Sequence, residues 1–295
     1  MTDTIEAEEQ VQPIIIYHAD CPDGFAAMTI LNYCLGGACE LVPGRYKEDP
    51  PEVTGRHVWI VDFSYDRDTM EKMWVICESL SMIDHHATAD DAIDWSTSDM
   101  DEAIALATGG QDFVWINQEM SGAGMVARFC EQVFDDFVAP GWVWNVEDRD
   151  LWKFELDDTA DVVAALTSYP YEYGVWEGLL DLSANDLADE GFAITRYREQ
   201  LIEAAMATAY RAIIPTGHEV WVACCPYAIG SDVAGRLAES SEEGWAAYYV
   251  NYGTRVRYGL RARDSSEVRS IAEAMGGGGH PQASGFECAM VPVPV

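Results

Sequence analysis

The sequence predicts an α/β protein with two domains, the first of them built on a parallel sheet. In the N-terminal half, short apolar runs typical of buried strands alternate with segments of helical periodicity. Such alternation favours parallel strands joined by right-handed crossovers. A second block of strands and helices follows a break in the pattern near Pro215. We therefore expect an N-terminal domain at 1–156, a helical linker at 157–215 and a smaller C-terminal α/β domain at 216–295.

Three strands and three helices account for most of the predicted N-terminal domain. Helical spacing is clearest where Met70, Met73 and Cys77 recur on one face. Gly36 is typical of the residue that follows a helix end. The acidic region 87–112 is weakly patterned, and we interpret it as a loop with a short helix. The expected strands are residues 13–17, 58–61 and 80–83, and the expected helices are residues 25–35, 67–80 and 121–134.

The linker and the C-terminal block continue the pattern. Helical periodicity predominates in the linker, which ends in an amphipathic run over 188–212. We interpret this run as a helix packed between the domains, with a homodimer face as the alternative. In the C-terminal block, Gly253 marks the turn of an expected hairpin. The expected strands there are residues 220–224, 245–251 and 255–261, and the expected helices are residues 232–239 and 267–275.

The composition is that of a globular protein with a large negative charge. Hydrophobic residues make up 49% and charged residues 23%, which excludes wholesale disorder. Acidic residues number 51 and basic residues 17, so the formal net charge is −34. No apolar run approaches the ~18–20 residues that span a bilayer. Residues 1–10 are acidic and polar, unlike a signal peptide. We expect a soluble, cytoplasmic protein with no membrane partner.

Charge and cysteine usage disfavour several classes of function. Long duplex nucleic acid is not an expected partner, because phosphate contacts need clustered cations and only three lysines are present. The eight cysteines form no paired CxxC motifs, which argues against a zinc ribbon. Without a secretory signal, a disulfide framework is not expected either.

The side chains that could carry chemistry follow the ends of three expected strands. Because parallel strands end at the same edge of a sheet, where ligands bind, we expect these side chains to converge. Carboxylates with imidazoles suit Mn²⁺, Zn²⁺ or Fe²⁺, whereas all-oxygen sets suit Mg²⁺. With about six ligands, a pair of ions ~3.5–4 Å apart is the economical interpretation. The candidates are His18, Asp20, Asp23, Asp62, Asp84, His85 and His86, with Asp148 from a fourth segment.

A run of four glycines followed by His280 is a second candidate site. Consecutive glycines allow backbone N–H groups to point at one anion, and an adjacent histidine can donate to a phosphate oxygen. A flexible loop is the alternative interpretation. The residues proposed to contact an anion are Gly277, Gly278, Gly279 and His280.

These motifs, in this order, resemble a known family. His18-Ala-Asp-Cys-Pro-Asp-Gly, Val61-Asp62, Asp84-His85-His86 and Glu147-Asp148-Arg-Asp resemble motifs one to four of the DHH phosphoesterase superfamily. The stretch 276–286 is similar to the glycine-rich signature of the associated C-terminal domain. The resemblance implies an N-terminal parallel-sheet DHH domain, a smaller C-terminal α/β domain and an active site in the cleft between them. It also implies dependence on two Mn²⁺ ions, with Mg²⁺ or another divalent ion as alternatives.

The resemblance implies a role for each candidate. One ion would be held by His18 and Asp20, and Asp62 would bridge the two ions. His86 would face the substrate phosphate, Asp84 would orient a histidine, and Arg261 would grip the substrate. The ligands of the second ion would be Asp23, His85 and Asp148. Two residues separate Asp20 from Asp23, where the commoner motif has one, so the assignment of these two stays open. Asp148 is chosen over Asp150, which could instead be a surface or capping carboxylate.

The expected activity is hydrolysis of phosphoester bonds by a two-metal mechanism, with hydroxide attack on phosphorus. Short oligonucleotides, dinucleotides or nucleoside bisphosphates are the expected substrates, because a chain of charge −34 offers little track for a long strand. Three alternatives stay open: a RecJ-like single-strand exonuclease, an inorganic pyrophosphatase and a catalytically silent nucleotide-binding relative. The exonuclease would need a basic groove formed by Arg196, Arg198, Arg211, Arg255 and Arg257.

Overall fold

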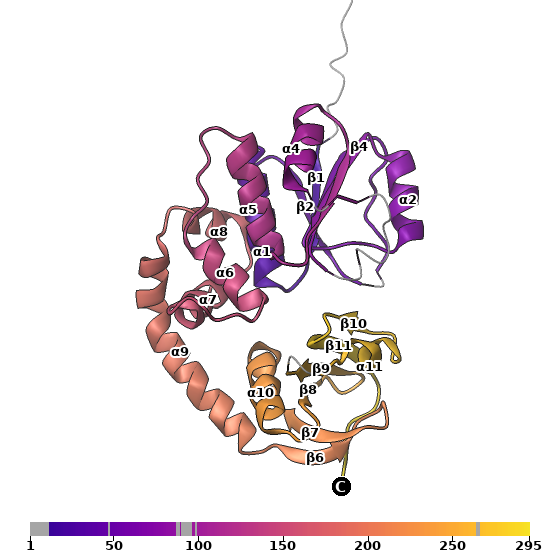
Figure 1. Cartoon of the computed structure of the whole chain (residues 1–295), viewed down its shortest axis with the longest axis vertical. Helices are drawn as coiled ribbons and strands as arrows, with labels where there is room; N and C mark the ends of the chain where they lie inside the picture. Colours follow the sequence, from indigo (N-terminus) through magenta and orange to yellow (C-terminus); the bar gives the residue numbers. More distant parts are fainter. Residues whose placement is uncertain (1–11, 47, 87–88, 90–95, 98, 264–265) are drawn as a thin grey trace, which may run out of the picture. The chain divides into compact units, whose positions relative to one another are not determined.

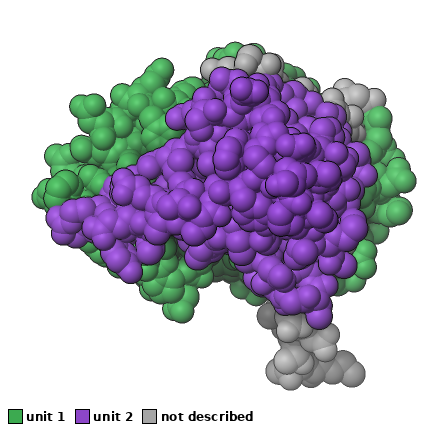
Figure 2. Space-filling model, turned by 90° about the horizontal axis from the view of Figure 1, so that it is seen from below, with its two compact units in different colours: residues 1–192 green, residues 193–295 purple. Residues whose placement is uncertain are grey.

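The computed structural model describes residues 12–46, 48–86, 89, 96–97, 99–263 and 266–295. It divides into two compact units, residues 1–192 and 193–295 (Figure 2). The expected domain limits at 156 and 215, like the cleft between the domains, stay predictions. The acidic residues 1–10, Lys47 and most of the expected loop at 87–98 lie outside the described residues.

The first unit contains the predicted parallel sheet, which has five strands. From edge to edge the order is β2 (Glu40–Gly44), β1 (Ile14–His18), β3 (His57–Val61), β4 (Ser79–Asp84) and β5 (Phe113–Ile116), and every neighbouring pair is parallel. The sequence did not predict β2 or β5. β5 has four buried residues, too few to show a period, and β2 is an edge strand containing Pro43 and Gly44.

Helices cover both faces of this sheet and bury a core on each (Figure 1). One face packs against α1 (Pro22–Cys34), α4 (Met100–Thr108) and α5 (Gly122–Val133), and α2 (Arg67–Ile76) covers the other. Successive residues of β1 alternate between the faces, so that Ile15 joins the first core while Ile14 and Ile16 join the second. The sheet is therefore buried on both faces, and its strand ends are left for the site.

Four helices follow the sheet: α6 (Trp142–Asp150), α7 (Thr159–Ser168), α8 (Tyr173–Leu179) and α9 (Ala184–Met206). The amphipathic run expected at 188–212 is helical only to Met206, because Tyr210 already begins strand β6. The described residues contain no helix with both the length and the apolarity needed to cross a membrane.

In its described residues, the second unit contains a mixed sheet of seven strands, the helices α10 and α11, and the C-terminal part of α9. The strand order is β10, β11, β9, β8, β7, β6, β12, and the pair β7–β8 is parallel whereas the other neighbours are antiparallel. The expected hairpin is confirmed as β8 paired with β9. The elements are β6 (Tyr210–Ile213), β7 (Glu219–Cys224), α10 (Tyr227–Ser240), β8 (Trp245–Asn251), β9 (Val256–Ala262), α11 (Arg269–Glu273), β10 (Gly278–Gly279), β11 (Ala283–Cys288) and β12 (Val293–Pro294).

Two glycines enclose the ring of Tyr248 in the core of the second unit. A Cβ added to Gly230 would lie 2.2 Å from Tyr248 Cε2, and one added to Gly259 would lie 2.0 Å from Cε1. Gly230→Ala is expected to lower the free energy of unfolding by about 1–3 kcal/mol, although alanine alone favours a helix by about 1 kcal/mol. Urea unfolding would measure this. Gly174→Ala in α8, where an added Cβ meets nothing within 4 Å, should be neutral or stabilising. Equal effects of the two substitutions would contradict the argument.

Candidate functional site

Three neighbouring strands deliver their terminal residues to one edge of the first unit's sheet. β1 ends at His18, Asp62 follows β3 directly, and His85 follows β4. Asp62 has a left-handed backbone with φ of 55°, which is uncommon for a residue with a side chain. Its N–H donates to the carbonyl of Ile83 at 2.9 Å. Such strained residues concentrate at functional sites.

Asp62 lies at the centre of the cluster and is fully buried. Its Oδ1 is 3.1 Å from His85 Nε2, and its Oδ2 is 3.5 Å from His18 Nδ1. Among the described residues, no donor forms a hydrogen bond with either oxygen. Both oxygens thus lie at ion-pair distance from an imidazole but without a well-formed hydrogen bond, so the burial of this carboxylate is only partly compensated.

The donor set around Asp62 fits a divalent cation. Ligand atoms of Asp23, Asp62 and His85 all lie within 4.8 Å of one another, as do those of His18, Cys21 and Asp62. Carboxylate and imidazole ligands of this kind suit Mn²⁺, Zn²⁺ or Fe²⁺. A cation here would complete the compensation that the neighbouring imidazoles give the two oxygens of Asp62 only in part.

The pKa shifts of the clustered side chains also favour a bound cation. Burial alone would raise the pKa of Asp62, but His18, His85 and His86 outweigh it and hold that pKa well below its usual range. Burial, together with the charge of Asp62, raises the pKa of Asp23 well above its ordinary value. Burial opposes protonation of His85, yet Asp62 and its carboxylate neighbours raise the pKa of His85 well above its ordinary value. The carboxylates are thus too crowded to ionise independently, and positive charge relieves the repulsion.

Backbone N–H groups at the N-terminus of α5 hold Asp23 in the cluster. The sequence did not predict this contact. The carboxylate of Asp23 accepts hydrogen bonds from the N–H groups of Gly122 and Ala123 at 2.7 and 3.1 Å. A Cβ on Gly122 would lie 2.5 Å from the Asp62 Cβ, and one on Gly24 would lie 2.9 Å from Asp62 Oδ2. Both positions need glycine so that the backbone can approach the central carboxylate. The small residues at the start of α5 were the feature of the sequence that could have indicated this close approach.

Asp84 holds the backbone and the ring of His86 through one carboxylate oxygen. Asp84 Oδ1 accepts from the N–H groups of His85 and His86 at 2.8 and 3.2 Å, and it lies 2.8 Å from His86 Nδ1. Burial opposes protonation of His86, but Asp84 raises the pKa of His86 above its ordinary value. With Nδ1 directed at Asp84, the orientation of the imidazole is fixed, and Nε2 lies on the side of the ring away from that carboxylate.

The structure places Asp150, not Asp148, in the cluster. Asp150 Oδ2 lies 3.5 Å from His85 Nε2. The carboxylate of Asp148 accepts hydrogen bonds from the N–H groups of Glu155 and Leu156, at 2.8 and 3.2 Å, and from the Thr159 hydroxyl. Asp148 therefore holds the loop that follows α6, and among the described residues it forms no ion pair with a histidine of the cluster. This geometry does not support the sequence-based choice of Asp148, and we replace it with Asp150 as the candidate ligand.

Asp20 and Cys21 lie beside the cluster, but neither side chain is suited to bind a metal ion as an anion. The Asp20 side chain is 57% exposed and pairs with Arg45 Nη2 at 3.3 Å. No metal-compatible group within the described part of the chain includes it. The geometry thus favours Asp23 over Asp20 as the ligand from the first motif. Burial, followed by the charges of Asp62 and Asp150, raises the pKa of Cys21 well above its ordinary value. Its thiol therefore stays protonated at neutral pH and is a poor ligand.

In the second unit, the glycine run is part of the sheet rather than an open loop. The N–H groups of Gly276 and Gly277 donate to the carbonyls of Glu273 and Ala272, at the end of α11. Gly278 and Gly279 form β10, paired with β11. His280 closes a tight turn, with its N–H donating to the carbonyl of Ala283 at 2.9 Å. The first two N–H groups of the run are thus already used, and the expected anion nest does not form from the whole run.

Arg261 is held by uncharged partners. Its Nη2 donates to Ser231 Oγ at 2.6 Å and its Nη1 to its neighbour Leu260 O at 2.8 Å. Arg257, four positions earlier on the same face of β9, packs its guanidinium over the Tyr227 ring at 4.4 Å. Within the described residues, neither arginine has a carboxylate at ion-pair distance. In a chain of charge −34, such arginines are suited to an anionic ligand.

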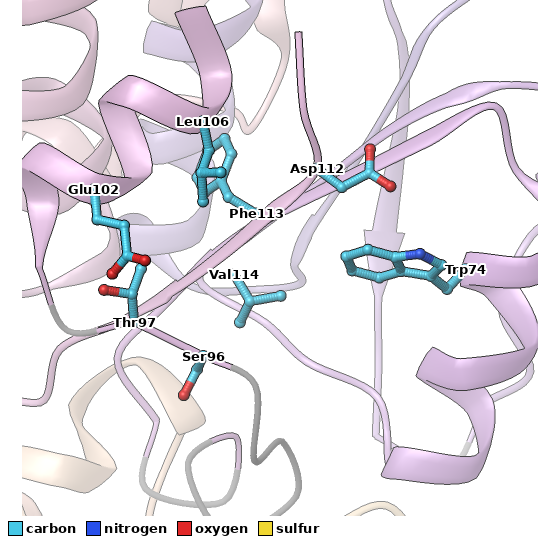
Figure 3. Close-up of a pocket in the computed structure, with 8 residues that line it drawn as sticks. All are labelled: Trp74, Ser96, Thr97, Glu102, Leu106, Asp112, Phe113 and Val114. Atoms are coloured by element: carbon cyan, nitrogen blue, oxygen red, sulfur yellow. The ribbon is translucent and has the colours of Figure 1, made fainter. Parts of the chain in front are cut away.

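A separate pocket of about 140 Å³ lies away from these residues (Figure 3). Its charged lining includes Glu102 and Asp112, and the Asp112 carboxylate accepts from the Leu80 N–H at 3.0 Å. Asp112 therefore contributes to the structure of the sheet. None of the predicted site residues lines this pocket, which is bordered by Trp74, Ser96, Thr97, Glu102, Leu106, Asp112, Phe113 and Val114.

Comparisons with known proteins agree with this architecture. No protein-family model matches the chain. An uncharacterized protein of Acanthamoeba polyphaga mimivirus is 24% identical, over 92% of this chain and 66% of that protein, so the chain spans less than two thirds of its relative's length.

Two solved structures share the fold. One is described as the DHH domain of a member of a family of ribosomal proteins, with a TM-score of 0.56 and 14% identity, over 93% of this chain and 82% of that one. The other is an exopolyphosphatase-related protein from Bacteroides fragilis, with a TM-score of 0.54 and 11% identity, over 95% of this chain and 88% of that one. The chain therefore shares its fold with these two structures, one of which is described as a DHH domain.

Proposed function

We propose that this chain is a divalent-metal-dependent phosphoesterase that hydrolyses phosphoester bonds of short nucleotide substrates. The observation that carries the proposal is the buried carboxylate of Asp62. Neither of its oxygens has a hydrogen-bond donor among the described residues, and Asp23 and His85 place ligand atoms within 4.8 Å. Buried carboxylates this close together repel one another, which a cation would relieve, and carboxylate–imidazole metal sites at strand ends are suited to phosphoryl chemistry.

The proposed ligands are the side chains that the first unit brings together: His18, Asp23, Asp62, His85 and Asp150. Mn²⁺ is the first cation to test, with Mg²⁺ as the alternative, and the number of ligands is compatible with two ions. When bound, the cations supply positive charge to the phosphoryl oxygens and promote ionisation of a water molecule.

The protein's own residues bind and orient the substrate phosphate. His86, held through Nδ1 by Asp84, presents Nε2 in a fixed orientation. Asp84 raises the pKa of His86, which favours the protonated ring, and the N–H at Nε2 can then donate to a phosphate oxygen. In the second unit, Arg257 and Arg261 are the proposed contacts for an anionic group.

A short nucleotide is the favoured substrate class, because the net charge of −34 opposes a long polyanion. Polyphosphate is the second candidate, since one protein with this fold is described as exopolyphosphatase-related. A longer single strand would need the arginines of the second unit to form a groove. However, Arg198, Arg211 and Arg255 are paired with carboxylates.

A substrate panel tests the proposal. The full chain would be incubated with Mn²⁺ and dinucleotides, short oligoribonucleotides, single-stranded DNA, nucleoside bisphosphates, pyrophosphate or polyphosphate. We expect hydrolysis of the short nucleotides, and its loss when EDTA removes the metal. Inertness towards every member would refute the enzymatic proposal, and a preference for pyrophosphate or polyphosphate would refute the substrate class alone.

A further inference from the structure

Tyr46 is a half-exposed aromatic side chain that lies directly against the histidines of the candidate metal centre. Its ring centroid is 5.8 Å from that of His18 and 6.3 Å from that of His86. The ring of Phe63, which is completely buried, supports it at 4.9 Å. Tyr46 is nevertheless 45% exposed. No sequence motif singled it out, because it follows the short edge strand β2 rather than a central strand.

The local backbone fixes the position of this ring. A Cβ added to Gly44, the last residue of β2, would lie 2.8 Å from ring carbons of Phe63, so Phe63 packs tightly against the strand end. The carbonyl of Gly44 accepts from the N–H of Ala19 at 3.1 Å, next to His18. Tyr46 is thus attached to a strand end that is itself joined to the first motif, and little conformational freedom is lost when a ligand contacts it.

Tyr46 meets the neighbouring rings of the site at an angle rather than face to face. Its contacts with His18 and His86 are edge-to-face, at 70° and 76°, and Phe63 is tilted by 46°. The ring therefore has its edge contacts with the metal centre and keeps 45% of the side chain exposed beside it. That exposed aromatic surface would gain hydrophobic stabilisation if a flat ligand covered it.

We propose that Tyr46 stacks on the nucleobase of the substrate, next to the phosphate held by the metal centre. This inference rests on the proposed function and narrows its substrate class. A phosphate or a polyphosphate has no planar face and gains nothing from an aromatic ring at the rim of the site. Every nucleobase has such a face, and stacking on a protein aromatic strengthens binding by roughly 10- to 100-fold. Tyr46 thus selects nucleotides over base-free phosphates.

The test compares one ligand with a base and one without it. The full chain would be titrated calorimetrically with AMP and with ribose 5-phosphate, in Mn²⁺ and in EDTA. Wild type is expected to bind AMP roughly 10- to 100-fold more tightly than ribose 5-phosphate. Tyr46→Leu should remove most of that ratio and leave the affinity for ribose 5-phosphate unchanged. Tyr46→Phe and Tyr46→Trp, which keep an aromatic ring, should preserve the ratio.

Tyr33→Leu is the matched control, since Tyr33 is exposed to a similar extent, 50%, but lies on α1 against Phe137. It should leave the ratio unchanged. The inference is overturned if wild type binds the two ligands equally or binds neither. It is also overturned if Tyr46→Leu weakens both equally, as a packing role would, or if Tyr46→Phe loses the ratio as well. Base-dependent binding without hydrolysis in the substrate panel would refute the proposed activity and leave this inference standing. Hydrolysis without a preference for the ligand with a base would refute this inference and leave the proposed activity standing.

Discussion

Asp62→Asn is expected to abolish the proposed thermal stabilisation by Mn²⁺ and to lower hydrolysis by roughly 10²–10³-fold or more. Asparagine has nearly the same shape as aspartate but carries no charge, and it presents an N–H₂ group where one carboxylate oxygen faced the imidazoles. Asp62 Oδ1 lies 3.1 Å from His85 Nε2, and Asp62 Oδ2 lies 3.5 Å from His18 Nδ1. Both histidines are themselves proposed metal ligands. Removing its charge therefore disables the whole cluster.

The size of the thermal effect follows from linkage. Metal at about 100 times its Kd adds about 2.7 kcal/mol to the free energy of unfolding. For a unit of this size that corresponds to a rise in Tm of roughly 5–10 °C. Differential scanning fluorimetry of wild type and Asp62→Asn, each with Mn²⁺ and with EDTA, would measure the difference directly.

Asp112→Asn is a suitable control for this substitution. Asp112 is also an aspartate of the first unit, but its carboxylate accepts from the Leu80 N–H at 3.0 Å, and the asparagine oxygen can still do so. The rise in Tm with Mn²⁺ should persist in this variant. If Asp62→Asn kept the full metal-dependent rise, Asp62 would not be a ligand and the proposed centre would be refuted.

The convergence of the cluster could be predicted from the sequence because it depends on strand ends alone. His18, Asp62 and His85 each follow a short apolar run, and parallel strands bring such positions to one edge whatever their exact boundaries. The glycine run of the second unit was harder to interpret. Its residues pair with β11, a strand whose composition, Ala-Ser-Gly-Phe-Glu-Cys, has weak β-propensity.

The choices between neighbouring aspartates could not be made from the sequence, because they depend on local rotation. Asp20 occupies a left-handed position with φ of 58°, before α1 begins, whereas Asp23 lies in the first turn of that helix and is buried. Asp148 and Asp150 are two positions apart on α6, and each helical residue turns the side chain by about 100°. They therefore face directions about 200° apart, and only one of them can point at His85. Which one does so depends on how α6 packs.

The second large expected effect concerns Asp150 and follows from the different directions of the Asp148 and Asp150 side chains. Asp150→Asn is expected to lower hydrolysis by roughly 10²-fold and to weaken Mn²⁺ binding, with little change in the stability of the metal-free protein. The reason is that Asp150 Oδ2 lies 3.5 Å from His85 Nε2 in the cluster, and its side chain is 26% exposed. Hydrolysis of the preferred substrate from the panel, together with the Mn²⁺-dependent rise in Tm, would measure both effects.

Asp148→Asn, its matched counterpart on the same helix, should do the opposite. Asp148 Oδ1 accepts from the Glu155 N–H, and Oδ2 accepts from the Leu156 N–H and the Thr159 hydroxyl. An asparagine side chain can place an acceptor at only one of these oxygens, so its N–H₂ group would oppose donors at the other. A loss of about 1–3 kcal/mol in the free energy of unfolding is expected, with metal binding and activity per folded molecule retained. The reverse outcome, in which Asp148→Asn removes the metal response and Asp150→Asn only destabilises, would return the ligand role to Asp148 and require α6 to be rotated from its position in this structure.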